Sequence, residues 1–153
     1  MHISNIKLWN YRKFGSDGEL DLDKPNLDLN FTNSLNVIIG ENDSGKTAII
    51  DAVKLVLKTH SYDYIRVEDK DFYNTSSRFR IELIFENLTP DEAKNFTEWL
   101  GWKGTGEEAK PFLKINYDVK KIKQGYYYLV VRNLDKGEYF FGSNDFMFAF
   151  GID

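Results

Sequence analysis

The stretch from Leu35 to Val53 reads Leu-Asn-Val-Ile-Ile-Gly-Glu-Asn-Asp-Ser-Gly-Lys-Thr-Ala-Ile-Ile-Asp-Ala-Val and is the most informative part of the sequence. Its first five residues are a short β-branched run that ends abruptly at Gly40, which is typical of a strand buried on both faces. From residue 44 to residue 58, apolar side chains leave only a thin polar stripe at helical spacing. The stretch therefore predicts a buried strand, a tight turn, and a helix that is buried on most sides.

The turn itself, residues 40–47, matches the pattern G-x-x-x-x-G-K-[ST] in full. A polyphosphate is wrapped by backbone N–H groups, and side chains at the tight positions would keep the backbone away from it. We expect Gly40 to let the chain leave the strand sharply and Gly45 to allow close approach where the helix begins. The helix N-terminus adds about half a positive charge. The phosphate-binding residues predicted in this way are Gly40, Asn42, Asp43, Ser44, Gly45, Lys46, Thr47 and Ala48.

Two side chains of the turn have a chemical task of their own. Lys46 is expected to reach the β and γ phosphate oxygens as a point charge. The hydroxyl of Thr47 is expected to bind Mg²⁺, which takes hard oxygen ligands and keeps several waters. The alternative is a Gly turn in which Asp43 and Ser44 merely cap a core helix. That alternative leaves Lys46, Thr47 and two correctly spaced glycines unexplained together.

The rest of the chain predicts strands around this unit. Alternating apolar residues predict a strand over 79–86, and Thr89-Pro-Asp-Glu92 is a capping box that predicts a helix running to about Leu100 and ended by Gly101. Further predicted elements are a strand over 3–9, a second strand or broken hairpin over 20–31, and an antiparallel meander over 112–121, 126–132 and 139–141. The order favours an α/β fold with a mixed sheet and one buried central helix.

Hydrolysis of a nucleotide would need a second carboxylate on a buried strand, and the sequence has no clear candidate. No run of four apolar residues is followed by Asp-Glu. The nearest segments are 81–86, which alternates like an exposed strand, and 146–153. We therefore predict no catalytic residue in this chain.

Composition excludes several other classes of protein. The 153 residues include no Cys and only two His, so a disulfide framework and a thiolate zinc site are excluded. Twenty basic residues stand against 24 acidic ones, so the chain has no basic excess to drive nonspecific nucleic-acid binding. No stretch of eighteen apolar residues and no secretory signal occur, which favours a cytoplasmic location.

Two segments carry a family resemblance: residues 3–14, which end in Asn10-Tyr-Arg-Lys-Phe14, and the stretch Leu35–Val53. Together they resemble the N-terminal end of RecF/SMC-type ABC ATPases, which are AAA-family ATPases. Within these they most resemble the OLD family (overcoming lysogenisation defect) of ATP-dependent endonucleases. The resemblance covers residues 1 to about 58 closely. Asp71-Phe72 and the strand over 78–86 continue it more loosely.

The resemblance implies a P-loop NTPase fold, an ABC-ATPase-like N-terminal lobe that binds ATP and Mg²⁺ and carries an antiparallel β meander. In the family, an Asn-[Phe/Tyr]-Arg-x-Phe element holds an Arg near the nucleotide, which implies that Arg12 is a nucleotide contact. From the residues alone, Arg12 could equally be a solvated arginine at a strand end. Many relatives have Gly where Asp43 stands, which implies a stiffer loop here.

Several family elements have no match in this sequence: the Ser-Gly-Gly signature, the Walker B strand, the switch histidine and the acidic Toprim nuclease centre. We therefore expect residues 1–153 to be a single partial P-loop ATPase domain, with the Walker A nucleotide-binding core in 1–58 and strands and one helix of the same lobe in 78–153. The apolar end at 146–152 also favours a truncated domain.

The resemblance also implies partners and a setting. We expect ATP hydrolysis only within a longer or dimeric protein, in which a second ATPase lobe or homodimer partner completes the site. DNA would be engaged through the full-length protein, in DNA repair or phage defence. Two alternatives stay open: a stand-alone small P-loop phosphotransferase, and a noncatalytic ATP-responsive interaction module.

Overall fold

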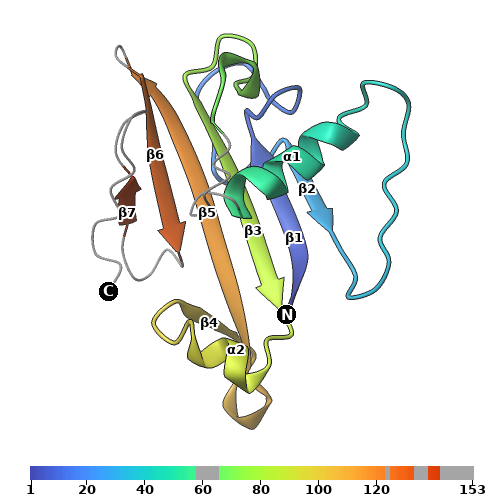
Figure 1. Ribbon diagram of the computed structural model, residues 1–153, viewed down its shortest axis with the longest axis vertical. Coiled ribbons are helices and arrows are strands. Elements are labelled where there is room, and N and C mark those ends of the chain that lie inside the picture. Colours follow the sequence, from blue (N-terminus) through green and yellow to red (C-terminus); the bar gives the residue numbers. More distant parts are fainter. Residues whose placement is uncertain (58–65, 123–124, 133–137, 142–153) are drawn as a thin grey trace.

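The structure, a computed structural model, describes residues 1–57, 66–122, 125–132 and 138–141, and side chains as far as residue 121. Its strands form one sheet, and the helix α1 crosses one face of that sheet (Figure 1). The elements are β1 (His2–Trp9), β2 (Leu27–Asn30), α1 (Lys46–Leu57), the 3₁₀ turn η1 (Asp69–Asp71), β3 (Arg78–Glu86), α2 (Pro90–Lys94), β4 (Leu100–Lys103), the 3₁₀ turn η2 (Gly106–Glu108), β5 (Lys110–Ile122), β6 (Gly125–Arg132) and β7 (Glu138–Phe141).

The sheet has the order β2-β1-β3-β5-β6-β7, and β4 pairs with the first residues of β5, 110–113. Every pairing among these described strands is antiparallel. The predicted meander is confirmed as β5, β6 and β7, and the predicted strand over 79–86 is confirmed as β3. The α/β class is likewise confirmed, but the described part of the sheet is antiparallel throughout and not mixed.

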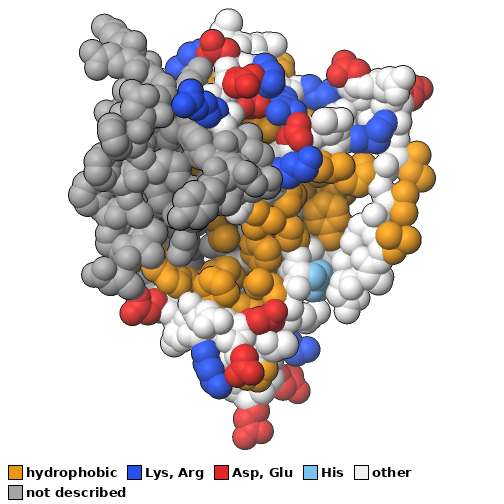
Figure 2. Space-filling view, viewed as in Figure 1, with side chains coloured by type: hydrophobic (Ala, Val, Ile, Leu, Met, Phe, Trp, Pro, Cys, Tyr) orange, Lys and Arg blue, Asp and Glu red, His pale blue; other side chains and the backbone are white. Residues whose placement is uncertain are grey.

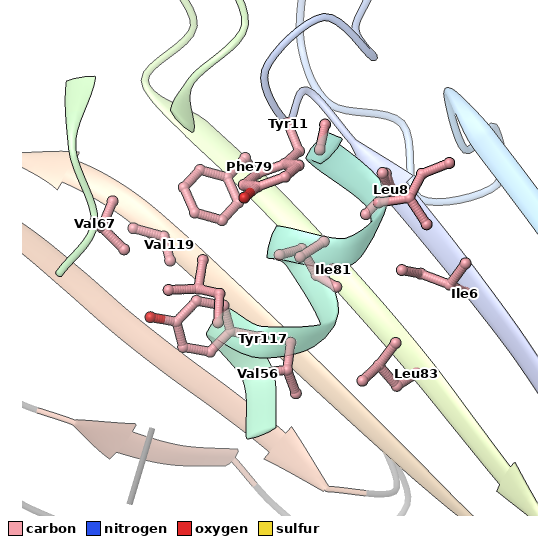
Figure 3. Packing of buried hydrophobic residues seen from close by; sticks show 14 of the residues in the cluster. Ile6, Leu8, Tyr11, Val56, Val67, Phe79, Ile81, Leu83, Tyr117 and Val119 are labelled. Carbon is pink, nitrogen blue, oxygen red and sulfur yellow. The ribbon is translucent and has the colours of Figure 1, made fainter. Parts of the chain in front are cut away.

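The core lies between α1 and one face of the sheet (Figure 3). Leu8, Ile81 and Tyr117 lie side by side on that face, because residues directly opposite each other on paired strands point to the same side of the sheet. The face of α1 that meets them has residues one helical turn apart, namely Ala48, Ile49, Ala52, Leu55 and Val56. Each large apolar side chain buried there stabilises the fold by about 1.5 to 3 kcal/mol.

The opposite face of the sheet is polar. Lys7, Glu82 and Asn116 are neighbours in register on β1, β3 and β5. Glu82 lies 3.9 Å from Lys7 and 3.6 Å from Lys114. Since Glu82 points away from α1, the segment 81–86 does not bring this carboxylate to the phosphate loop. The other carboxylate segment considered, residues 146–153, lies outside the described residues.

The prediction of a buried strand over residues 35–39 is wrong for this structure. The segment is not part of the sheet, and Leu35, Val37 and Ile39 are 86%, 69% and 89% exposed. Figure 1 shows the chain between β2 and α1 running out beside the sheet without a neighbouring strand. A β-branched run forms a buried strand only where another strand offers hydrogen bonds, and no described strand pairs with this segment; only Ile38 is partly buried against the core.

The helix after this segment is shorter and more exposed than predicted. It begins at Lys46 rather than residue 44, and Ile50 and Leu57 are 49% and 53% exposed. Figure 2 shows hydrophobic atoms gathered over the outer side of the region that α1 occupies. The sheet covers one side of α1, so its second apolar side faces outward.

The helix predicted over residues 90–100 is also shorter. Its capping box is confirmed, with Thr89 accepting from the Glu92 N–H at 3.2 Å, but α2 ends at Lys94. From there i to i−3 hydrogen bonds lead to Trp99, and Leu100 begins β4 opposite Leu113. Gly101 therefore lies in a strand and does not end a helix. The second strand or hairpin predicted over residues 20–31 is also shorter, because only Leu27–Asn30 form a strand, β2.

No described helix is long and apolar enough to cross a membrane.

Candidate nucleotide-binding site

The predicted phosphate loop forms the wall of a cavity of about 370 Å³ at the N-terminus of α1. Of the predicted site residues, only Gly40 does not line it. The lining residues are Arg12, Lys13, Asn42, Asp43, Ser44, Gly45, Lys46, Thr47, Ala48 and Lys70. Because the first N–H groups of a helix have no intrahelical acceptor, this cavity is suited to an anion.

The turn has two residues with left-handed backbone angles, Asp43 (φ 63°) and Gly45 (φ 98°). Asp tolerates this region better than most residues. At Gly45 a side chain would also have no room, because an added Cβ would lie 2.5 Å from Cζ of Phe14. The second glycine of the motif is therefore required by both backbone angle and space.

Lys46 folds back over its own loop. Its Nζ donates to the carbonyl of Gly40, to the carbonyl of Glu41 at 2.6 Å and to Ser44 Oγ at 3.5 Å. Gly40 thus belongs to the site through its carbonyl, although it does not line the cavity. Lys13 Nζ donates to the Asp43 carbonyl from the other side of the loop. Both lysines therefore donate to carbonyls of the loop in this structure.

Arg12 joins three segments beside the cavity. Its NH1 donates to Asp51 of α1 at 2.7 Å, and its Nε donates to Asp71 of η1 at 2.9 Å. Burial lowers the pKa of the Arg12 guanidinium, but the bonds to both carboxylates outweigh this and raise it above its ordinary value. Burial also raises the pKa of the neighbouring Tyr11, so its hydroxyl stays protonated. Arg12 is therefore a fixed cation next to the loop and not a solvated strand end.

Sequence reasoning missed two cations of this cavity, Lys13 and Lys70. Lys13 belongs to the same Asn-Tyr-Arg-Lys-Phe element as Arg12, so its place in that element was an available signal. Lys70 gave no local signal, because it sits in the acidic run Glu68-Asp-Lys-Asp71 and reaches the cavity only through the docking of η1.

The cavity also fits a magnesium ion that arrives with phosphates. Thr47 lines the cavity beside Ser44, and its hydroxyl is a hard oxygen ligand of the kind that Mg²⁺ takes. Asp43 is the only carboxylate among the lining residues, and the described part of the chain has no group of three acidic or His side chains arranged to hold a metal ion. One protein oxygen plus phosphate oxygens and waters is a usual ligand set for Mg²⁺.

Comparison with known proteins relates this chain to ATPases. The model of a family described as "AAA ATPase domain" matches residues 1–141. DNA replication and repair protein RecF of Listeria welshimeri is 36% identical over 72 residues, which are 47% of this chain and 16% of that protein. RecF of Lysinibacillus sphaericus is 37% identical over 62 residues, which are 40% of this chain and 14% of that protein. The chain thus spans only a small part of the length of these curated relatives.

A solved structure shares the fold. It is described under the words "Structural biochemistry of ATP-driven dimerization and DNA stimulated activation of SMC ATPases", and it aligns with a TM-score of 0.54 at 19% identity, covering 85% of this chain and 69% of that one. The family match covers 141 of the 153 residues, so the chain belongs to the AAA ATPase domain family, and its fold is that of the SMC ATPase structure.

Proposed function

We propose that this chain is the Mg-ATP-binding Walker A lobe of an ABC-type ATPase that acts on DNA, of the RecF or OLD type, in repair or phage defence. The observation that carries the proposal is the cavity that the phosphate loop, the start of α1 and Arg12 line together. In this proposal the loop amides and Lys46 bind the β and γ phosphates, and Thr47 binds Mg²⁺. The assignment of residues 1–153 to one partial lobe, working in the cytoplasm, belongs to the same proposal.

ATP hydrolysis is proposed to need parts outside the described residues. Within them, the carboxylates nearest Arg12, Asp51 and Asp71, are already engaged with its guanidinium. The exposed apolar residues of segment 35–39 and the outer side of α1 offer the surface that a completing part of the domain would cover. The SMC ATPases that share the fold are described as undergoing ATP-driven dimerization, and we propose that a second lobe closes on the nucleotide here as well.

A thermal unfolding experiment with Mg-ATP tests the proposal. At a nucleotide concentration a hundred times Kd, binding adds about 2.7 kcal/mol and should raise Tm by about 5 to 10 °C. Lys46→Ala should abolish the shift, because the cation that reaches the phosphates is gone. Thr47→Ala should leave a shift that no longer depends on Mg²⁺.

The matched control for these variants is Lys94→Ala, since Lys94 is an exposed lysine on α2 and not a lining residue of the cavity. It should keep the full shift. A wild-type Tm that is indifferent to Mg-ATP would refute ATP binding by this lobe.

A further inference from the structure

The 3₁₀ turn η1 is fixed beside the phosphate loop by one buried carboxylate. Asp71 is 4% exposed, and its side chain accepts from Arg12 Nε at 2.9 Å and from the Glu68 N–H at 2.9 Å. Its backbone carbonyl accepts from the Arg12 N–H at 2.8 Å. Residues 68–71 therefore have a defined position relative to Arg12, which itself borders the cavity.

This docking brings Lys70 to the cavity wall, opposite the start of α1. Lys70 lines the loop cavity and also an adjoining cavity of about 220 Å³, and Arg12 is shared by both. Its Nζ is paired with Glu68 Oε2 at 2.7 Å, in a pair whose side chains are 67% and 58% exposed. Such an exposed pair is weak, so a polyanion that enters the cavity can compete for the lysine.

The cations that line the cavity differ in how firmly they are paired with carboxylates. Arg12 is balanced by two carboxylates, while Asp43 is the only acidic lining residue. Among the other lining cations, Lys13 and Lys46 donate to loop carbonyls, and Lys70 is paired with the exposed carboxylate of Glu68. A flexible four-carbon stem lets a lysine exchange one anionic partner for another with little backbone movement.

We propose that Lys70 is a further phosphate contact of the bound nucleotide, delivered by the Asp71 docking and released from Glu68 when the nucleotide binds. The proposal rests on the proposed function and assigns a residue that neither the loop motif nor the Arg12 element contains. Asp71 acts as a positioning residue, because it holds the turn on which Lys70 sits.

Titration of the full chain with Mg-ATP tests this assignment. Lys70→Gln should raise Kd about tenfold, since a charge-assisted hydrogen bond is lost, and Lys70→Arg should recover most of the affinity. Glu68→Gln should lower Kd by about two- to fivefold, because the competing carboxylate is gone. Lys94→Gln is the matched control: Lys94 forms a similar exposed pair with Asp91 at 3.0 Å, away from the cavity, and should leave Kd unchanged.

The outcomes separate this inference from the proposed function. Tm of nucleotide-free Lys70→Gln should equal that of the wild type, so that a weaker Kd reports a lost contact and not a lost fold. If Lys46→Ala abolishes binding but Lys70→Gln and Glu68→Gln behave like Lys94→Gln, Lys70 is no contact and the ATP-binding proposal stands. If the wild type binds no Mg-ATP, both the proposed function and the role of Lys70 are refuted.

Discussion

Gly45 and Gly18 have almost the same left-handed backbone angle, φ 98° and 101°, in very different surroundings. A Cβ at Gly45 would meet the Phe14 ring at 2.5 Å, whereas at Gly18 nothing lies within 4 Å. We predict that Gly18→Ala lowers the free energy of unfolding by about 1 to 2 kcal/mol through the backbone angle alone. Gly45→Ala should cost about 1 to 3 kcal/mol more, because the ring must move.

Urea unfolding of both variants measures the difference. Gly45→Ala should also weaken Mg-ATP binding, while Gly18→Ala should not, since Gly18 is outside the cavity. Equal losses of stability in the two variants would show that the Phe14 ring does not pack closely against residue 45.

At the scale of single residues, the sequence predicted the lining residues that belong to the loop, 42–48. Of the lining residues from other segments it predicted Arg12 but not Lys13 or Lys70. The loop residues follow each other in a motif, so their shared role is visible as spacing. Arg12 needed the family resemblance, because an arginine at a strand end has no distinctive local signal. Lys70 depends on the contact between Asp71 and Arg12, 59 residues apart, which no local pattern encodes.

At the scale of elements, the segment 35–39 has the composition of a buried strand in an exposed position. In the proposed function, a further part of the domain covers these side chains. By contrast, β3, the meander and the α2 capping box were predictable because alternation and capping are local signals. The helix expected to reach residue 100 stops at Lys94 because pairing of β4 with β5 overrides helix propensity.

The exposure of this segment leads to a stability prediction. Replacing Leu35, Val37 and Ile39 together by Ser should change the free energy of unfolding by less than about 0.5 kcal/mol, since these side chains are already in water. Leu83→Ala, in the buried core, should cost about 2 to 5 kcal/mol as a control. A loss of several kcal/mol in the triple variant, measured by urea unfolding, would mean that the segment packs as a core strand after all.

At the scale of the whole molecule, the sheet has one apolar face covered by α1 and one polar face that carries Glu82 away from the cavity. The described lining of the cavity has four cations and one carboxylate, Asp43, whereas hydrolysis also needs a group that orients the attacking water. We predict that the chain alone binds Mg-ATP but releases ADP no faster than Lys46→Ala does, in a steady-state assay with excess nucleotide.

Two other results of that assay would each change the account. Steady ADP release by the wild type alone would mean that the chain carries its own catalytic carboxylate. ADP release that appears only with a small-molecule acceptor would favour a phosphotransferase.

The central claim, that the turn over residues 40–47 is shaped to hold the phosphates of ATP, is tested most directly by a crystal structure of the chain with Mg²⁺ and a nonhydrolysable ATP analogue. The account predicts the β and γ phosphates among the amides of residues 43–48, Lys46 Nζ within hydrogen-bond distance of a phosphate oxygen, and Mg²⁺ on the Thr47 hydroxyl. A nucleotide bound elsewhere, or a turn whose amides point away from the phosphates while Lys46 contacts only its own loop, would contradict it.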